Sequence, residues 1–261
     1  MPPLLELSGV SKTYRSGGRT VTALDGVSFA LARAETLAVV GPSGSGKSTL
    51  ARAVMQLVRP DRGEIRFDGR ALGAIRGEEL RKLRRRFQMV FQDPLAAFNP
   101  RATIARVLDD PLRVHGLAAK AERPARVRDL LERVGLDRSL AARHVHEVSG
   151  GQRQRVAIAR AMATRPDLIV LDEAVSALDV TVRANILNLL RELRETEHLA
   201  YLFISHDLAV VRSFAHRIIV MDEGRIVEEG QAAEIIARPQ SETGRQLVAA
   251  MPVLKARGMA P

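Results

Sequence analysis

A glycine-rich loop between an apolar strand and a helix constrains this chain most. Residues 41–49 read GPSGSGKST, which fits the pattern G-x-x-x-x-G-K-[ST]. The apolar run Thr36–Val40 precedes the loop, and a helical pattern over Lys47–Leu57 follows it. Glycine has no Cβ, so the backbone can wrap closely around an anion, with N–H groups and the helix N-terminus facing it. The sequence predicts a nucleotide-phosphate site in which Lys47 reaches the β- and γ-phosphates and Ser48 ligates Mg²⁺.

A second apolar run ends in two acidic residues. Leu168–Leu171 is predicted to be a buried strand, and Asp172 and Glu173 follow it directly. Asp172, at the carboxyl end of the strand, is placed to hold Mg²⁺ directly or through water. Glu173 is the natural general base for an attacking water molecule.

The remaining pattern predicts an α/β protein. Residues 4–40 read as short strands, Asp68-Gly69 as the turn of a hairpin after Glu64–Phe67, and DEGRIVEEG as a closing hairpin. Helices and strands alternate after residue 150, which indicates a largely parallel sheet. These later elements are expected at Gly151–Thr164, Leu168–Leu171, Val182–Glu195, Ala200–Ile204, Leu208–Phe214 and Arg217–Met221. Before them, Glu78–Arg86 reads as a polar helix and Phe87–Phe91 as a strand.

The stretch from Asp93 to Val148 has few strand formers and reads as a helical insertion. Its helices are expected at Ile104–His115 and Lys120–Val134, with breaks at Asn99-Pro100, Pro111, Gly116 and Gly135. His144 and His146 stand at strand spacing but make a poor metal site without a carboxylate or cysteine partner, so we expect packing or surface residues. The last dozen residues, ending KARGMAP, are expected to fray.

Composition excludes several classes of protein. The chain has 261 residues of which 46% are hydrophobic, which is enough for a full core, and it has no cysteine for a disulfide, thiol nucleophile or Cys-ligated metal. No apolar run approaches the roughly 18 residues of a spanning helix, and MPPLLELSGV lacks the features of a secretory signal.

The formal charge of +10 is spread along the chain except for the run Arg84–Arg86. That run is either a solvated helix face or a contact with lipid headgroups or a membrane subunit.

Four further motifs carry a resemblance to a known family. Ser149-Gly150-Gly151-Gln152 precedes a helix, Ser176-Ala177-Leu178-Asp179 follows the acidic strand, Gln92 ends FQMVF, and His206 follows the strand YLFI. With the phosphate loop and the acidic strand, the chain resembles ATP-binding-cassette (ABC) ATPases, the motor subunits of membrane transporters, over roughly residues 4–230. The resemblance implies a single P-loop ATPase domain over 4–230. It has a mixed, largely parallel sheet, an antiparallel β subdomain, a helical subdomain at about 93–148 and a helical tail at 231–261.

The resemblance also implies roles for individual residues. Tyr14 would stack on adenine, Gln92 would sense the γ-phosphate and couple to the membrane partner, and Ser149–Gln152 would bind ATP held on the opposing subunit. Asp179 would organise the dimer interface, and His206 would contact the γ-phosphate and hold Glu173 and water in line. The residues expected to touch ATP are Tyr14, Gly41, Pro42, Ser43, Gly44, Ser45, Gly46, Lys47, Ser48, Thr49, Ser149, Gly150, Gly151, Gln152 and Asp179; those expected to hold Mg²⁺ are Ser48, Gln92 and Asp172; those expected in catalysis are Glu173, His206 and Gln92.

The Q-loop region, FQDPLAAFNPR, resembles that of importers for peptides, opines and nickel. Ala174 replaces the usual proline after the catalytic glutamate, and the segment Ser241–Pro252 resembles the C-terminal ending of nickel-import ATP-binding proteins. Nickel import is therefore the preferred interpretation and peptide import the alternative. The implied partners are two membrane-spanning permease subunits, a second ATP-binding subunit forming a heterodimer, and an external solute-binding protein. The chain would lie at the cytoplasmic face of a bacterial inner membrane, held only through the permease subunits.

Two other classes of protein compete with the transporter interpretation. A soluble ABC ATPase acting on ribosomes or DNA would suit the basic charge, but such proteins usually join two cassettes or insert a coiled coil, so we expect no nucleic-acid partner. A binding module that does not hydrolyse ATP is disfavoured because Lys47, Glu173, His206 and the SGGQ segment are all intact.

Overall fold

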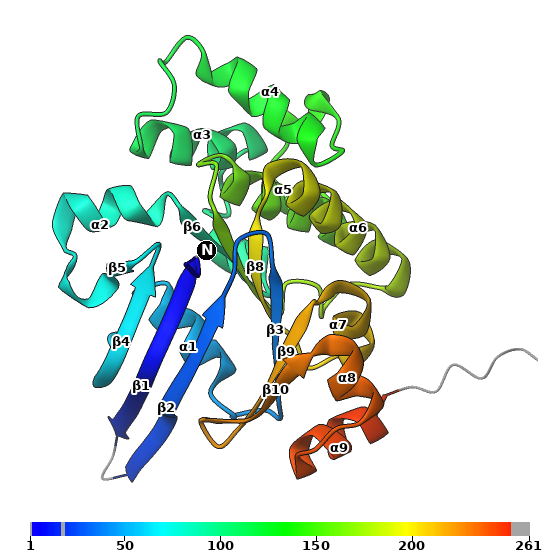
Figure 1. Ribbon diagram of the computed structural model, residues 1–261. Coiled ribbons are helices and arrows are strands. Elements are labelled where there is room, and N and C mark those ends of the chain that lie inside the picture. The colour runs from blue at the N-terminus through cyan, green and yellow to red at the C-terminus, as the bar shows by residue number, and fades with distance from the viewer. Residues whose placement is uncertain (1, 17–18, 252–261) are drawn as a thin grey trace, which may run out of the picture.

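Two β-sheets form the framework of the protein, whose computed structural model describes residues 2–16 and 19–251 (Figure 1). The antiparallel sheet has the order β2-β1-β4-β5, and the larger sheet has the order β10-β9-β3-β8-β7-β6. Strands of the first sheet are β1 (Leu5–Ser16), β2 (Arg19–Leu31), β4 (Arg62–Phe67) and β5 (Arg70–Ala71). Strands of the second are β3 (Thr36–Val40), β6 (Phe87–Val90), β7 (Leu168–Asp172), β8 (Ala200–Ile204), β9 (Arg217–Asp222) and β10 (Arg225–Gln231). The second sheet is parallel except for β10 on β9, so the predicted mixed α/β architecture is confirmed.

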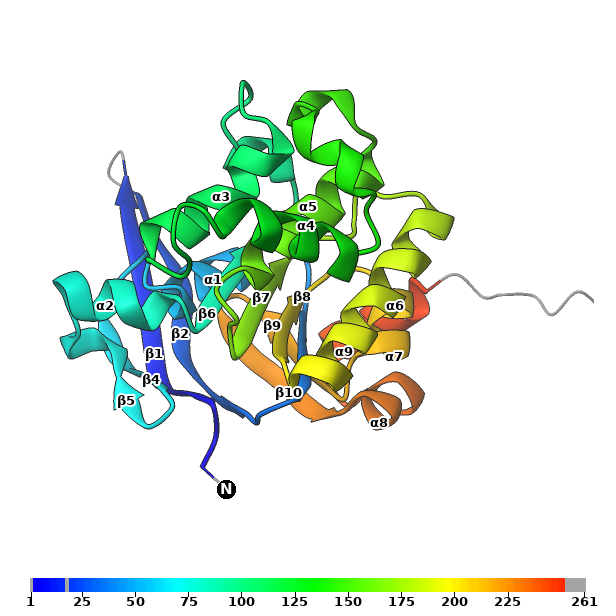
Figure 2. The same cartoon turned by 90° about the horizontal axis from the view of Figure 1, so that it is seen from above.

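Helices lie on both faces of the larger sheet, and a group of helices extends from one end of the molecule (Figures 1 and 2). The helices are α1 (Lys47–Val54), α2 (Gly77–Arg84), α3 (Ile104–Val114), α4 (Arg123–Arg133), α5 (Gly150–Met162), α6 (Val180–Glu197), α7 (Leu208–Phe214), α8 (Ala232–Ala237) and α9 (Glu242–Ala249). Short 3₁₀ segments are η1 (Leu72–Ala74), η2 (Pro94–Ala97), η3 (Arg138–Ala142) and η4 (Val145–Glu147).

The larger sheet separates two hydrophobic cores. Along β3, Ala38 and Val40 pack into the core shared with α3 to α8, while Leu37 and Val39 pack into the core shared with α1 and the antiparallel sheet. Both faces are covered, so all five residues of β3 are buried. This explains why the strands of this sheet read as continuous apolar runs rather than as alternating patterns.

The helical insertion is present, with differences from prediction. The helix predicted over Lys120–Val134 is shorter, running as α4 over Arg123–Arg133. The helix expected to break at Pro111 continues through it as α3, with the proline inside. His144 and His146 do not occupy a strand: His144 caps η4, and the two rings stack 5.4 Å apart. Within the described residues, no group of three or more His, Cys, Asp or Glu side chains that could hold a metal ion is present. The interpretation of this pair as packing or surface residues stays a prediction.

The first two strands are longer than predicted. β1 and β2 run for 12 and 13 residues, and their register shifts near Gly9 and near Lys12. Gly9 has φ +60, typical of a bulge, which interrupts the alternation that sequence reading depends on. The helix predicted to reach Leu57 ends at Val54.

The last two helices of the described chain pack back on the larger sheet and its neighbouring helices. Ala232 and Ile235 of α8 are buried in the core shared with α7, and α9 contacts β9. The predicted fraying at KARGMAP lies outside the described residues, and the domain limits at 230 and 231 stay a prediction. None of the helices in the described part of the chain is long and apolar enough to cross a membrane.

Candidate functional site

The glycine-rich loop connects the end of β3 to the start of α1, as predicted. Gly41 and Gly46 are required by the space around them: an added Cβ would lie 2.1 Å from the carbonyl oxygen of Met221 and 2.2 Å from that of Ala23, respectively. Gly46 caps α1 at φ +101, a conformation that disfavours side chains. The loop is thus packed against β9 and β2, and the first residues of α1 line the cleft beside it.

Lys47 lies inside the loop rather than in solvent. Its side chain is 7% exposed, and Nζ donates to the carbonyl oxygens of Gly41 (2.9 Å) and Pro42 (2.7 Å). Burial lowers the pKa of Lys47 below its ordinary value of 10.5, while Glu173 and Asp172 act in the opposite direction. Neutral carbonyl groups are weak partners for an ammonium, so Lys47 is positioned to exchange them for an anion.

The acidic residues stand at the end of β7, two strands from the loop. Ser48 Oγ donates to Asp172 Oδ1 at 3.3 Å, which joins the first turn of α1 to the acidic strand. Burial raises the pKa of Asp172 above its ordinary value of 3.8, and Glu173 raises it further, although the Ser48 bond lowers it. A half-buried carboxylate with a hydroxyl neighbour is the donor set that Mg²⁺ prefers, so Ser48 and Asp172 fit the predicted metal.

Glu173 and His206 face each other across adjacent strands. His206 Nδ1 lies 3.4 Å from Glu173 Oε2. β7 and β8 pair in parallel with Asp172 opposite Ile204, so the residues after each strand come together. Glu173 has φ +50, and its backbone N–H donates to Ile204 at 3.1 Å. This strained residue is held where a carboxylate and an imidazole can act on one water molecule.

A cleft of about 460 Å³ brings these predicted residues together. Its walls are formed by Val21, Ala23, Ser43, Gly44, Gly46, Lys47, Ser48, Thr49, Glu173 and His206. Val21 and Ala23 were missed by sequence reasoning. They stand two apart on β2 and so share a face, but only the packing of β2 beside the loop shows that this face lines the cleft.

Several other predicted residues lie outside the lining: Gly41, Pro42, Ser45 and Asp172, which belong to the loop and the acidic strand beside it, and Tyr14 and Gln92. Tyr14 is 39% exposed and is the cross-strand partner of Val21, which places it beside the cleft, with Lys12 Nζ 5.6 Å from its ring centroid. Gln92 stands two residues beyond the end of β6 at Val90, one residue past the end predicted for that strand, and is exposed.

The segment Ser149–Gln152 occupies a separate place, at the start of α5. Ser149 and Gln152 form a reciprocal capping box, with hydrogen bonds of 3.2 and 3.0 Å. A Cβ on Gly151 would lie 2.6 Å from Val182 Cγ1, so the glycine permits α5 to approach α6 closely. Asp179 caps α6 by accepting from Val182 N–H at 2.9 Å. None of these described residues lines the cleft, so within one chain the predicted site remains in two parts.

Arg183 links the neighbourhoods of these two parts. Its Nη1 donates to Asp207 Oδ2 at 2.8 Å, and its Nη2 donates to the carbonyl oxygen of Leu178 at 3.0 Å. Asp207 follows His206 and caps α7, and Leu178 precedes Asp179. Sequence reasoning missed Arg183 because nothing in a helical pattern shows that it reaches another loop.

Comparison with known proteins agrees with this arrangement. A family model described as ABC transporter matches residues 24–176, more than half of the chain. A putative peptide import ATP-binding protein of Brucella ovis is 47% identical over 96% of this chain and 79% of its own length. The glutathione import ATP-binding protein GsiA of Pectobacterium atrosepticum is 47% identical over 96% of this chain and 41% of its own length.

Solved structures show the same fold. The ATP-binding cassette MJ0796, in a dimeric post-hydrolysis state bound to ADP and Pi, is 33% identical with a TM-score of 0.78 and covers 87% of this chain and 98% of its own. CbiO1 from Clostridium perfringens, part of the transporter complex cbiONQ, is 29% identical with a TM-score of 0.81 over 91% of this chain and 92% of its own. On the family model and on relatives aligned over almost its whole length, this chain belongs to the ABC transporter family as an ATP-binding protein.

Proposed function

We propose that this chain is the ATP-hydrolysing subunit of an ABC importer for short peptides or peptide-like solutes. The observation that carries the ATPase assignment is the meeting of Lys47, Glu173 and His206 in one cleft next to the Ser48–Asp172 pair. The solute class rests on the relatives, which are named as peptide and glutathione import ATP-binding proteins. The preference for nickel, drawn from Ala174 and the tail, is not confirmed, and these names favour the alternative.

In this proposal the loop N–H groups and Lys47 hold the phosphate chain of ATP. Lys47 already stands among the loop carbonyls, so little rearrangement is needed when a phosphate replaces them. Ser48, Asp172 and Gln92 would hold Mg²⁺, which would supply positive charge against the phosphates. Tyr14 would stack on the adenine, and the loop residues Gly41–Thr49 would enclose the phosphates.

Glu173 would accept the proton of the attacking water, and His206 would hold that carboxylate and the γ-phosphate in line. The carboxylate and imidazole lie 3.4 Å apart. General-base catalysis of this kind contributes roughly 10² to 10⁴ in rate, and the rest comes from positioning and charge stabilisation.

The separate position of Ser149–Gln152 supports a head-to-tail pair of ATPase subunits. In such a pair the N-terminus of α5 and the Ser149 cap would face the γ-phosphate of ATP on the partner, with Asp179 between the subunits. ATP then favours the closed pair because it contacts both halves only there. We propose a second ATP-binding subunit, two permease subunits and an external solute-binding protein as partners, with this chain peripheral at the cytoplasmic side.

The test is ATP-dependent uptake in vesicles carrying the chain with its presumed partner subunits. Labelled dipeptide, glutathione and ⁶³Ni²⁺ are offered in parallel. Dipeptide or glutathione uptake supports the proposal, whereas nickel uptake alone would restore the interpretation drawn from Ala174. Glu173→Gln should lower ATP turnover by about 10²-fold or more while nucleotide binding persists.

A matched control is Glu234→Gln, which makes the same change at an exposed position of α8 far along the chain. Glu234→Gln should leave both turnover and uptake unchanged. Equal turnover in the Glu173→Gln variant and the unmodified protein would show that the base is assigned wrongly.

A further inference from the structure

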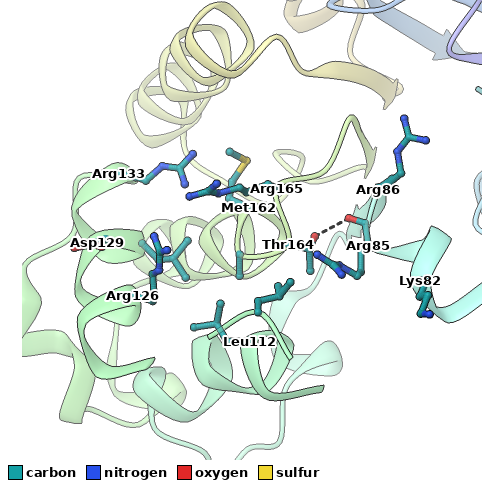
Figure 3. Close-up of a pocket in the computed structure, with 13 residues that line it drawn as sticks. Lys82, Arg85, Arg86, Leu112, Arg126, Asp129, Arg133, Met162, Thr164 and Arg165 are labelled. Atoms are coloured by element: carbon teal, nitrogen blue, oxygen red, sulfur yellow. Dashed lines mark hydrogen bonds between the residues drawn. The ribbon is translucent and has the colours of Figure 1, made fainter. Parts of the chain in front are cut away.

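The three arginines of the run Arg84–Arg86 have different environments, and Figure 3 shows two of them, Arg85 and Arg86. Arg84 donates to the carbonyl oxygen of Gln56 at 2.8 Å, and Arg86 forms ion pairs with Asp68 (2.8 Å) and Asp167 (2.6 Å). Arg85 has no side-chain hydrogen bond or ion pair to any residue that the structure describes. Two members of the run therefore stabilise the fold, and the third is left free of such a role.

Arg85 lines a cavity of about 550 Å³ between α2, the helical insertion and the turn from α5 to β7. Its charged lining consists of Lys82, Arg85, Arg86, Arg126, Arg133, Arg165 and Asp129. Figure 3 shows Arg126, Arg133 and Arg165 on one side and Arg85 opposite them, while Arg86 points away. Elements distant in sequence thus bring six cations and one carboxylate to the same hollow.

Most of these charges lack a counter-charge. Arg133 pairs with Glu197, and Arg86 pairs as described above. The other four cations form no ion pair with the described residues: Lys82, Arg85, Arg126 and Arg165. The nearby His115 is affected by this excess: burial lowers its pKa below 6.5, and Arg85 and Arg81 lower it further. Cations gathered in a concave surface with low-dielectric walls produce a positive potential that attracts anions.

The floor of the cavity is apolar. This floor consists of Leu112, Leu130 and Met162, which line the cavity together with the arginines and are each at most 5% exposed. A site with this lining suits a ligand that has an anionic group and a carbon-rich remainder. Guanidinium groups bind phosphate oxygens in pairs, so several converging arginines favour a phosphate ester over a single carboxylate.

The cavity is distinct from the nucleotide cleft. Arg85 and Arg165 precede β6 and β7, so they stand at the amino ends of those parallel strands. Glu173, His206 and the phosphate loop stand at the carboxyl ends of β7, β8 and β3, and the two linings share no residue.

We propose that this cavity is a second anion site, which binds a phosphate ester with its phosphate on Arg85, Arg126 and Arg165 and its carbon portion on the apolar floor. A soluble organic phosphate and the headgroup of an anionic phospholipid share this chemistry. A ligand bound in this cavity would contact both the helical insertion and the residues that lead into β6 and β7, and it would lie away from the phosphates of ATP.

The test uses calorimetric titration of the full chain with phenyl phosphate, and sedimentation with vesicles of phosphatidylglycerol or of neutral phosphatidylcholine. The double variant Arg126→Gln/Arg165→Gln should weaken binding of the phosphate probe by about tenfold or more. The matched control is Arg106→Gln/Arg128→Gln, which removes the same charge from α3 and α4 at a different hollow. Binding that persists in Lys47→Ala lies outside the nucleotide cleft, so this test is independent of the proposed ATPase function.

Loss of phenyl phosphate binding in the cavity variant alone supports the site with a soluble ligand. Loss of phosphatidylglycerol binding in that variant alone, with no heat from phenyl phosphate, supports it with a lipid headgroup. Failure of the unmodified protein to bind both phenyl phosphate and phosphatidylglycerol would overturn the proposal. Equal weakening of binding in the two double variants would also overturn it, because a dispersed positive surface explains that result. Circular dichroism of each variant checks that the helices remain folded.

Discussion

Replacing Gly46 by alanine is expected to damage both the stability of the fold and the phosphate site. An added Cβ would lie 2.2 Å from the carbonyl oxygen of Ala23 and 3.4 Å from Leu24 Cδ2. A backbone oxygen cannot rotate aside as the end of a flexible side chain can. The loop and β2 must therefore move apart, and Ala23 is part of the wall of the cleft.

The size of the effect follows from two costs. An alanine at φ +101 is held in a sparsely populated conformation, which costs about 1–3 kcal/mol. Forcing extra atoms into a packed contact costs about 1–3 kcal/mol more. The variant Gly44→Ala separates the conformational cost from the packing cost, because Gly44 has φ +81 but a Cβ there would meet nothing within 4 Å. Only the conformational cost applies to Gly44→Ala.

The assay is urea unfolding of both variants followed by circular dichroism, with fluorescent-nucleotide binding measured alongside. Gly46→Ala should lose at least about 1 kcal/mol more unfolding free energy than Gly44→Ala, and should bind nucleotide more weakly. Equal losses in the two variants would refute the close packing of β2 against the loop, and with it our assignment of Ala23 to the cleft wall.

Two further predictions concern His216 and Arg183. Burial lowers the pKa of His216 below 6.5 and Arg194 lowers it further, while the neutral ring accepts from Thr36 N–H at 2.9 Å. Below pH 6.5 this histidine is protonated in the unfolded chain but stays neutral in the folded chain. The unfolding free energy should therefore decrease as the pH is lowered from 6.5 to the lowered pKa of His216, and level off below it. His216→Gln should flatten this slope in urea titrations, and an unchanged slope would contradict the assignment. Arg183→Met should lower the ATP turnover number about ten- to a hundredfold with little change in nucleotide affinity, because it removes the ion pair that holds Asp207 next to His206. Arg183→Lys keeps the charge and should recover part of the rate. Equal turnover numbers in both variants and the unmodified protein would exclude a positioning role.

Local patterns in the sequence were sufficient for the parts of the site that lie at strand ends. The loop, Asp172–Glu173 and His206 each follow an apolar run, and parallel strands bring their carboxyl ends to one edge of a sheet. The alternation of helices and strands after residue 150 also predicted the larger sheet closely, with boundaries within about two residues.

Contacts that depend on register or on long side chains were not predictable. The bulge near Gly9 shifts the pairing of β1 with β2, so the alternation in β2 does not show which residues reach the cleft. Pro111 was expected to break the helix predicted over Ile104–His115, but it lies inside the continuous helix α3. Leu108 and Leu112 of α3 are buried, and that packing maintains the helix despite the missing donor. The partners of Arg84 and Arg86 follow from tertiary packing, which a run of identical residues cannot encode.

The charges around the cleft indicate what kind of ligand completes it. The loop N–H groups and Lys47 present positive charge. Lys47 donates to the carbonyl oxygens of Gly41 and Pro42 and to Ser45 Oγ, all of which are neutral, so an anion can bind the ammonium without first displacing a carboxylate. Two strands away, Asp172 and Glu173 place two carboxylates side by side, and burial already raises the pKa of Asp172. A bare nucleotide would satisfy the loop but repel these carboxylates. A nucleotide that carries a divalent cation between its phosphates and Asp172 satisfies both sides, and we therefore expect nucleotide affinity to fall when Mg²⁺ is removed with a chelator.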